Sequence, residues 1–151
     1  MATILMMGAF DTKGLEYAFL REEMLVRGHQ VLAVDTGVVG EGNHFPVDVR
    51  AEEVAQMGGS TLEALRAAGD RGSAMKVMSA GVALCAKRLY DEGRFAGIIG
   101  RGGSGGSSVV TAAMRALPVG VPKVCISTVA SGDTSAYIGA KDVVLVLSLI
   151  H

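Results

Sequence analysis

The sequence is poor in aromatic residues, proline, histidine and cysteine. Its 151 residues contain no Trp, three Pro, three His and two Cys, and only 5% are aromatic. Two cysteines far apart in apolar segments do not form the disulfide framework of a small secreted domain, so we expect Cys85 and Cys125 to be packed thiols. Three scattered histidines give little support to a zinc site.

The sequence also lacks an excess of one charge and any long hydrophobic run. Lys and Arg number 14, Asp and Glu number 15, and the sequence pI is about 6.3. Without a basic stripe, a nucleic-acid surface is not expected. The longest fully apolar stretch, at 143–147, is too short to span a bilayer. Residues 1–4 carry no basic charge and lead directly into a strand-like run, so we expect no signal peptide, no membrane attachment and a cytoplasmic location.

What the sequence has is glycine and an alternation of apolar runs with helical periodicity. Half of the residues are hydrophobic and 21 are glycine. The pattern predicts strands at 3–8, 30–34, 95–99, 123–127 and 143–147. It predicts helices at 15–27, 50–56, 61–68 and 73–91, and a last one that ends near residue 116. We therefore expect residues 1–151 to form one Rossmann-like α/β (sub)domain. It would be a three-layer sandwich with a mostly parallel sheet of about five strands and helices on both faces.

A run of glycine and serine at 100–108 follows the third predicted strand and precedes a helix. Its sequence is GRGGSGGSS, and we interpret it as a loop. Bare backbone N–H groups before a helix N-terminus are suited to binding phosphate. Gly100, Gly102 and Gly105 match G-x-G-x-x-G, but that dinucleotide pattern normally follows the first strand, and no lysine completes a Walker motif. Tight helix–sheet packing remains an alternative explanation.

Small polar residues follow the other predicted strands as well. Because parallel strands share a carboxyl edge, we expect these segments to line one pocket. The candidate ligand-binding residues are Asp11, Thr12, Lys13, Asp35, Thr36, Gly37, Arg71, Gly102, Gly103, Ser104, Gly105, Gly106, Ser107, Ser127 and Thr128.

Several of these residues have two interpretations. Asp11 or Thr12 could cap the following helix, or Asp11 could orient Lys13 or hold Mg²⁺ through water. Asp35 is either a ribose-binding acid or a solvated turn residue, and Arg71 either reaches a phosphate or is simply exposed. No nucleophile–base pair is visible, so the residues indicate binding without evident catalytic machinery. Whether the protein is an enzyme stays open.

Four segments, at 8–14, 34–37, 98–106 and 122–133, occur together in an order that resembles the N-terminal ATP-binding domain of the tobamovirus-resistance (Tm-one-like) family and its uncharacterised bacterial relatives. The resemblance implies a Rossmann-like fold that binds ATP with Mg²⁺ nearby. By motif match it places nucleotide contacts on the Asp11–Lys13 segment, on Thr36 and on the 102–106 segment, with a further contact near Arg71. The plant member of the family binds a viral replication protein, a property that fold resemblance does not transfer.

The sequence departs from the family in two ways. The family continues into a second α/β subdomain, and residues 143–151 resemble the corresponding segment poorly. We expect this chain to be the N-terminal part of a longer protein that forms a homodimer, with an unidentified protein partner. The predicted function is nucleotide binding, with ATP and Mg²⁺. The alternative is part of an enzyme that acts on a phosphorylated substrate or uses a nicotinamide cofactor.

Overall fold

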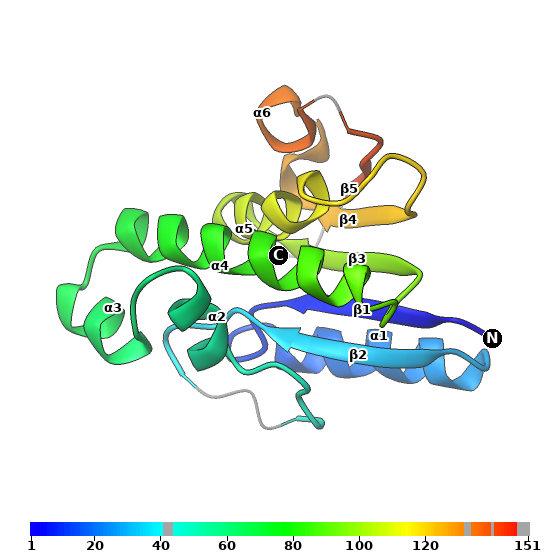
Figure 1. The fold of residues 1–151 in the computed structure, drawn as a ribbon, viewed down its shortest axis with the longest axis horizontal. Helices are drawn as coiled ribbons and strands as arrows, with labels where there is room; N and C mark the ends of the chain where they lie inside the picture. Colours follow the sequence, from blue (N-terminus) through cyan, green and yellow to red (C-terminus); the bar gives the residue numbers. More distant parts are fainter. Residues whose placement is uncertain (41–43, 132–133, 140, 148–151) are drawn as a thin grey trace.

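The computed structural model describes residues 1–40, 44–131, 134–139 and 141–147. Asp133, the last residue of the 122–133 motif, lies outside the described residues. Five parallel strands form one sheet in the order β2-β1-β3-β4-β5 (Figure 1). The strands are β1 Thr3–Gly8, β2 Gln30–Asp35, β3 Gly97–Gly102, β4 Lys123–Ser127 and β5 Val144–Leu147.

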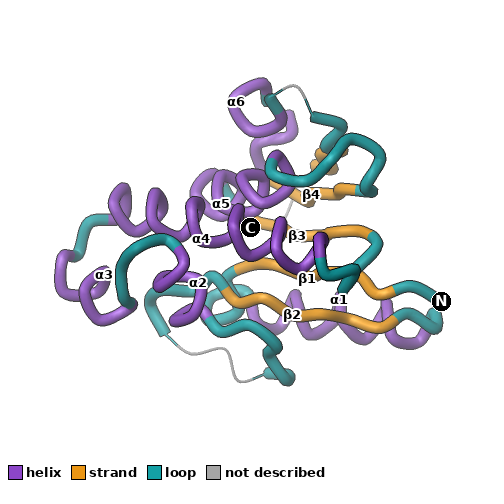
Figure 2. Tube along the Cα trace, viewed as in Figure 1, coloured by secondary structure: helices purple, strands orange, loops and turns teal. Residues whose placement is uncertain are grey.

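Helices cover both faces of this sheet (Figure 2). Helix α1 Gly14–Val26 packs on one face, where Met6, Tyr17 and Met24 form a small core. The other face carries α2 Ala51–Met57, α4 Arg71–Asp91 and α5 Ser104–Arg115 over a larger core that includes Leu5 and Met7. Strand β1 alternates its side chains between the two cores, as the period of two requires. The predicted three-layer α/β architecture is confirmed.

The shorter elements lie at the margins of the sandwich. They are α3 Leu62–Ala68, which precedes α4, and the 3₁₀ turn η1 Thr128–Ser131 and helix α6 Ser135–Ile138, which connect β4 to β5. None of the helices in the described part of the chain is long and apolar enough to cross a membrane.

The strand order changes direction between β1 and β3. From β1 the chain passes through α1 on one face to reach β2, whereas from β3 it passes through α5 on the other face to reach β4. The two connections separate above the carboxyl ends of β1 and β3 and leave a crevice there. In open α/β sheets this switch point is where ligands bind.

The glycine run is not a loop, which corrects the sequence interpretation. Gly100–Gly102 complete β3, and α5 begins at Ser104, so only Gly103 lies between strand and helix. No glycine in the run 100–106, described throughout, has a positive φ. A Cβ on Gly100 would lie 2.5 Å from a methyl of Val110, so this glycine allows α5 to pack closely on β3. Close packing explains part of the glycine content.

Helix α4 begins two residues earlier than the sequence suggested. Asp70 is its N-cap, and the carboxylate accepts a hydrogen bond from Gly72 N at 3.0 Å. The interruption between α3 and α4 is therefore confined to Gly69, which lies in the left-handed region at φ 64°, and to the N-cap residue Asp70. Arg71 consequently lies in the first turn of α4 rather than in a loop.

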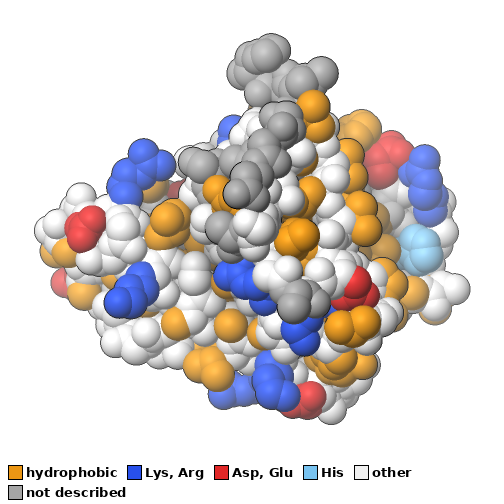
Figure 3. Space-filling view, turned by 90° about the horizontal axis from the view of Figure 1, so that it is seen from above, with side chains coloured by type: hydrophobic (Ala, Val, Ile, Leu, Met, Phe, Trp, Pro, Cys, Tyr) orange, Lys and Arg blue, Asp and Glu red, His pale blue; other side chains and the backbone are white. Residues whose placement is uncertain are grey.

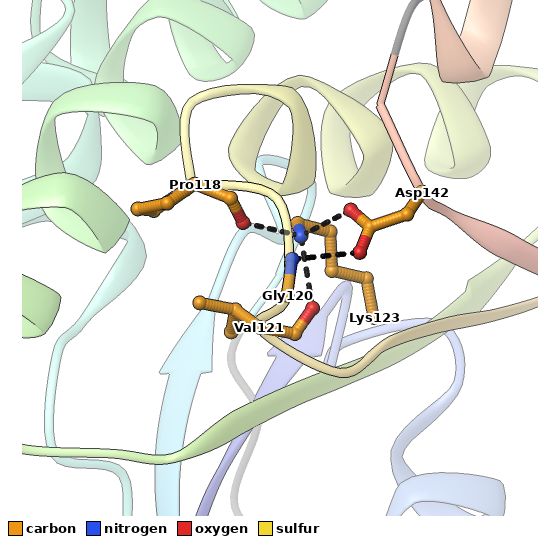
Figure 4. A network of polar contacts seen from close by, with 5 residues as sticks. All are labelled: Pro118, Gly120, Val121, Lys123 and Asp142. Carbon is orange, nitrogen blue, oxygen red and sulfur yellow. Dashed lines mark hydrogen bonds and ion pairs between the residues drawn. The ribbon is translucent and has the colours of Figure 1, made fainter.

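At the amino end of β4 a buried lysine joins two segments (Figure 4). Lys123 Nζ donates to Pro118 O at 2.7 Å, Val121 O at 2.8 Å and Asp142 Oδ1 at 2.7 Å. Asp142 also accepts from Gly120 N, and its hydrogen bond with Lys123 is the main cause that lowers its pKa to about 2. All three ammonium hydrogens of Lys123 have acceptors, so this buried charge has a structural role.

Candidate functional site

A cleft of about 820 Å³ lies at the carboxyl edge of the sheet, above the switch point. This volume is within the range of small-molecule sites. Four segments line the cleft, namely the loop after β1, the segment after β2, the α3–α4 region and the glycine run. The lining residues are Ala9, Asp11, Thr12, Lys13, Thr36, Gly37, Val38, Val39, Leu65, Arg66, Gly69, Asp70, Arg71, Ala74, Met75, Met78, Arg101, Gly102, Gly103, Gly105, Gly106 and Val109.

A second, smaller hollow of about 360 Å³ lies at the opposite end of the strands. Residues such as Ile4, Met24 and Val124 line it, and no polar side chain is among its lining residues in the described chain. A ligand there would have no group to fix its orientation. The candidate site is therefore the larger cleft, which collects the polar strand ends.

The cleft brings together most of the residues that the sequence singled out. Those that line it are Asp11, Thr12, Lys13, Thr36, Gly37, Arg71, Gly102, Gly103, Gly105 and Gly106. Asp35, Ser107, Ser127 and Thr128 are not among its lining residues, and Ser104 is the first residue of α5. Three of the four strand ends thus meet in the cleft, while the end of β4 lies beside it.

Asp11 connects the loop after β1 to the segment after β2. Its Oδ1 accepts from Thr12 N at 2.7 Å, and its Oδ2 accepts from Val39 N and Gly40 N at 3.0 Å each. A Cβ on Gly37 would lie 2.3 Å from Asp11 Oδ1, so the glycine makes room for this carboxylate. Asp11 therefore shapes the rim of the cleft and does not cap α1.

Asp35 has a related structural role deeper in the protein. It is 7% exposed, and its Oδ1 accepts from Phe10 N at 3.1 Å and from Gly37 N at 2.9 Å. Burial raises the pKa of this carboxyl, although the hydrogen bonds from Gly37 and Phe10 oppose the shift. Asp35 is thus not a solvated turn residue, and its carboxylate fixes the two loops from below.

Ser107 and Ser127 are both fully buried, and their hydroxyls are hydrogen-bonded to each other. The contact joins the first turn of α5 to the end of β4. Thr128 is exposed, and its hydroxyl oxygen lies 3.9 Å from the point that a Cβ on Gly103 would occupy. These residues support the floor and the side of the cleft rather than its interior.

Two of the helix N-termini at the cleft have no side-chain cap. Helix α3 is capped by Thr61, α4 by Asp70, and at α2 the Glu53 carboxylate accepts from Arg50 N. Within the described residues no side chain caps α1 or α5, whose N-cap residues are Lys13 and Gly103. Both N-caps line the cleft. Free N–H groups and the positive ends of two helix dipoles therefore meet at one place, which favours an anion.

The glycines of the run are not equivalent. A Cβ on Gly102 would lie 2.8 Å from backbone atoms of Gly106, so Gly102, like Gly100, is needed for packing. For Gly103 and Gly106 the nearest atoms would be 3.9 and 3.8 Å away, which is ordinary contact. The fold itself therefore does not require glycine at these two positions. Their backbone is open to a ligand.

The charges around the cleft are mainly basic. Lys13, Arg66, Arg71 and Arg101 line it, whereas the Asp11 and Asp70 carboxylates already accept backbone N–H groups. The upper face of the molecule shows Lys and Arg scattered rather than gathered into one basic surface (Figure 3).

Arg66 and Arg101 were not singled out from the sequence. Arg66 donates from Nε to Val38 O at 2.5 Å, and this contact between distant segments has no sequence signal. For Arg101 the alternation of β3 is such a signal. It places Arg101 on the same face of the strand as Ile99, the face that α1 covers. Arg101 is only 8% exposed.

The rest of the cleft is apolar. Val38 comes from the segment after β2, Leu65 from α3, and Met75 and Met78 from α4. The combination of an apolar wall with a basic edge and two helix N-termini fits a ligand that carries both a flat apolar group and anionic groups.

Comparison with known proteins gives the family. The family described as "Uncharacterised protein family (UPF0261) N-terminal domain" matches residues 2–151. The chain belongs to this family. It is 46% identical over 147 residues to a UPF0261 protein of Clostridium tetani, which covers 97% of this chain and 36% of that protein. A UPF0261 protein of Mesorhizobium japonicum is 39% identical over 149 residues, 99% of this chain and 36% of that protein.

A plant relative supports the resemblance drawn from the four motifs. The ToMV resistance protein Tm-1(GCR237) of Solanum lycopersicum is 50% identical over 80 residues, 53% of this chain and 11% of that protein. The resemblance to this group and to its bacterial relatives is confirmed. The chain spans about a third of the length of the bacterial UPF0261 proteins.

Proposed function

We propose that this UPF0261 domain binds ATP in the cleft above the switch point. The observation that carries the proposal is the convergence of two uncapped helix N-termini, those of α1 and α5, on one basic cleft. Their free N–H groups would hold the phosphates, assisted by Lys13. The open backbone at Gly103 and Gly106 allows the phosphates to approach closely.

The apolar wall suits the base. Val38 and Met75, backed by the buried Leu65 and Met78, offer a surface on which an adenine ring can stack and be dehydrated. A nicotinamide dinucleotide is less favoured, because the acid at the end of β2 uses its Oδ1 for Phe10 N and Gly37 N. The resemblance to an ATP-binding domain supports the same choice.

Magnesium would enter the cleft with the phosphates. Among the described residues no group of three or more His, Cys, Asp or Glu could hold a metal ion. Both oxygens of Asp11 accept backbone N–H groups. Because the Asp11 oxygens are already occupied, the cleft fits a Mg²⁺ that keeps several waters and is held by the ligand's phosphates. It does not fit a Mg²⁺ that the protein ligates directly.

We propose a binding role rather than turnover by this domain. The cleft-lining residues supply backbone N–H groups, cations and apolar surface, and neither Cys nor His is among them in the described chain. A role as one part of an enzyme is the second candidate. It is favoured by one observation, that the bacterial relatives are about three times as long as this chain.

A thermal-shift panel on the 151-residue chain tests the proposal. ATP, ADP, AMP, adenosine, NAD and pyrophosphate are each compared with and without Mg²⁺. A ligand at one hundred times its dissociation constant stabilises the fold by about 2.7 kcal/mol. We expect the largest shift with Mg²⁺–ATP and little with adenosine. An unchanged midpoint with every nucleotide contradicts ATP binding, and a larger shift with NAD favours the enzymatic candidate.

A further inference from the structure

Arg101 occupies the centre of the switch point. It is the fifth residue of β3 and lies on the face of the sheet that α1 covers. Its backbone is held by Tyr17, whose hydroxyl accepts from Arg101 N at 2.7 Å and lies 2.9 Å from Arg101 O. The side chain is 9% exposed and lines the cleft. The position of this arginine is therefore fixed by the fold.

Its guanidinium lacks the partners that a structural arginine would have. Among the described residues, Arg101 Nε is the one buried side-chain nitrogen or oxygen without a hydrogen-bond partner. Nη1 lies 3.8 Å from Glu16 Oε1, which is an ion pair too long for a hydrogen bond. A buried charge in this condition is costly unless another group completes its hydrogen bonds.

Lys123 shows how the same fold treats a structural buried cation. Its three ammonium donors meet Pro118 O, Val121 O and Asp142 Oδ1, all within 2.8 Å (Figure 4). Arg101 is also buried but has an unused donor beside a cleft. The contrast indicates that the missing acceptor at Arg101 belongs to a ligand.

The neighbouring groups favour an anionic acceptor. The uncapped N-termini of α1 and α5 flank the position, with Lys13 on the α1 side. The acidic groups on the cleft lining, Asp11 and Asp70, already accept backbone N–H groups. Glu16 is half-exposed and holds the guanidinium only weakly. An oxyanion in the cleft would compete with Glu16 at little cost.

We propose that Arg101 is the phosphate receptor of this cleft and that Glu16 is its resting partner. A phosphate group of the bound nucleotide accepts from Nε and an Nη atom of Arg101 as a two-pronged pair and displaces the Glu16 carboxylate. The planar guanidinium is suited to this geometry, whereas a lysine offers a single point charge. The inference rests on the proposed function and names the residue that selects ligands by their phosphates.

Calorimetric titration of the 151-residue chain and three variants tests it, with ATP, pyrophosphate and adenosine as probes. Arg101→Gln should weaken ATP and pyrophosphate binding at least tenfold and change adenosine binding less than threefold. Arg101→Lys should recover only part of the loss. Arg66→Gln is the matched control, because the Arg66 guanidinium already donates to Val38 O, and it should weaken ATP less than Arg101→Gln does.

Glu16→Gln provides a second test that does not depend on the folding of an Arg101 variant. If Glu16 competes with the ligand, its neutralisation should tighten pyrophosphate binding by threefold or more. Unchanged or weaker binding overturns the resting-partner role. ATP affinity in Arg101→Gln within threefold of the wild type overturns the receptor role but leaves ATP binding intact. If the wild type binds neither ATP nor pyrophosphate, the proposed function falls together with this inference.

Discussion

The Tyr17 hydroxyl and the backbone of Arg101 are hydrogen-bonded across the switch point, with Tyr17 Oη 2.7 Å from Arg101 N. The β1–β3 pairing ends one residue earlier, at Met7 and Gly100, and the same hydroxyl also reaches Met7 O at 2.7 Å. Tyr17 thus continues the connection between the two strands beyond their ladder. A Cβ on Gly8 would lie 1.9 Å from this hydroxyl, so glycine is required there. Burial raises the pKa of Tyr17, which keeps the hydroxyl protonated.

Tyr17→Phe should destabilise the fold and weaken ligand binding together. The change leaves Arg101 N without its acceptor in a buried site, at a cost of about 1–3 kcal/mol. Urea unfolding measures the stability, and ATP titration measures the affinity. Tyr90→Phe is the control, because the Tyr90 ring packs against Phe95 away from the cleft. Stability within about 0.5 kcal/mol of the wild type would show that the Tyr17 bridge contributes nothing.

Substitutions in the glycine run should separate stability from binding. Gly100→Ala pushes a methyl into Val110 and Met7 O and should cost about 1–3 kcal/mol. In Gly103→Val the new Cβ has room, because the nearest atom, Thr128 Oγ1, lies 3.9 Å away. It should retain the unfolding midpoint but lose ATP affinity tenfold or more, because the side chain blocks the approach of a phosphate. Tight ATP binding by a folded Gly103→Val variant would contradict a phosphate site at this backbone.

The Lys123–Asp142 pair should make stability depend on acid pH. The pKa of Asp142 is lowered to about 2 from a reference value of 3.8, mainly through its hydrogen bond with Lys123. The stabilisation that this pair gives to the fold is therefore complete above pH 3.8 and is lost as pH falls through about 2. Asp142→Asn should be less stable than the wild type at pH 7, with the difference narrowing toward pH 2. Urea unfolding midpoints of both proteins from pH 7 to pH 2 measure this stability difference. A difference that stays constant over the range would contradict a stabilising role of the Asp142 charge.

The two buried thiols should report opening of the fold. Burial raises the pKa of Cys85 and of Cys125 to about 11, so both remain protonated and shielded at pH 8. Iodoacetamide should label them only when the protein opens. Saturating ATP at one hundred times its dissociation constant should slow labelling about a hundredfold where global opening is limiting. Rapid labelling of the native chain would contradict the packing of these residues.

The sequence predicted the fold well because hydrophobic periodicity is strong here. All five strands were anticipated, and β1 and β4 have the predicted bounds. The glycine run was misread as a loop because glycine propensity was weighed without the close approach of α5 to β3. Val110 contacts the position of a Gly100 Cβ, and no local pattern reveals such a contact. The start of α4 was placed late because Asp70 was not recognised as its cap.

The candidate site was anticipated in location but less well in detail. The shared carboxyl edge correctly brought Asp11, Thr36 and Gly103 to one cleft. The roles of the two carboxylates were not predictable, because Asp11 and Asp35 bind backbone N–H groups of loops that are distant in sequence. Arg101 was overlooked because it stands among glycines and beyond the predicted end of the strand at residue 99, whereas β3 continues to Gly102.

Amide hydrogen exchange followed by NMR tests whether the uncapped N-termini of α1 and α5 hold phosphate. Saturating Mg²⁺–ATP should protect the amides of Gly14, Leu15, Gly105 and Gly106, and adenosine should not. The amides of the first turn of α2, none of whose residues lines the cleft and where Glu53 already accepts from Arg50 N, should change little and serve as the internal control. Protection by ATP that leaves the first turns of α1 and α5 unchanged would contradict phosphate binding at these helix ends.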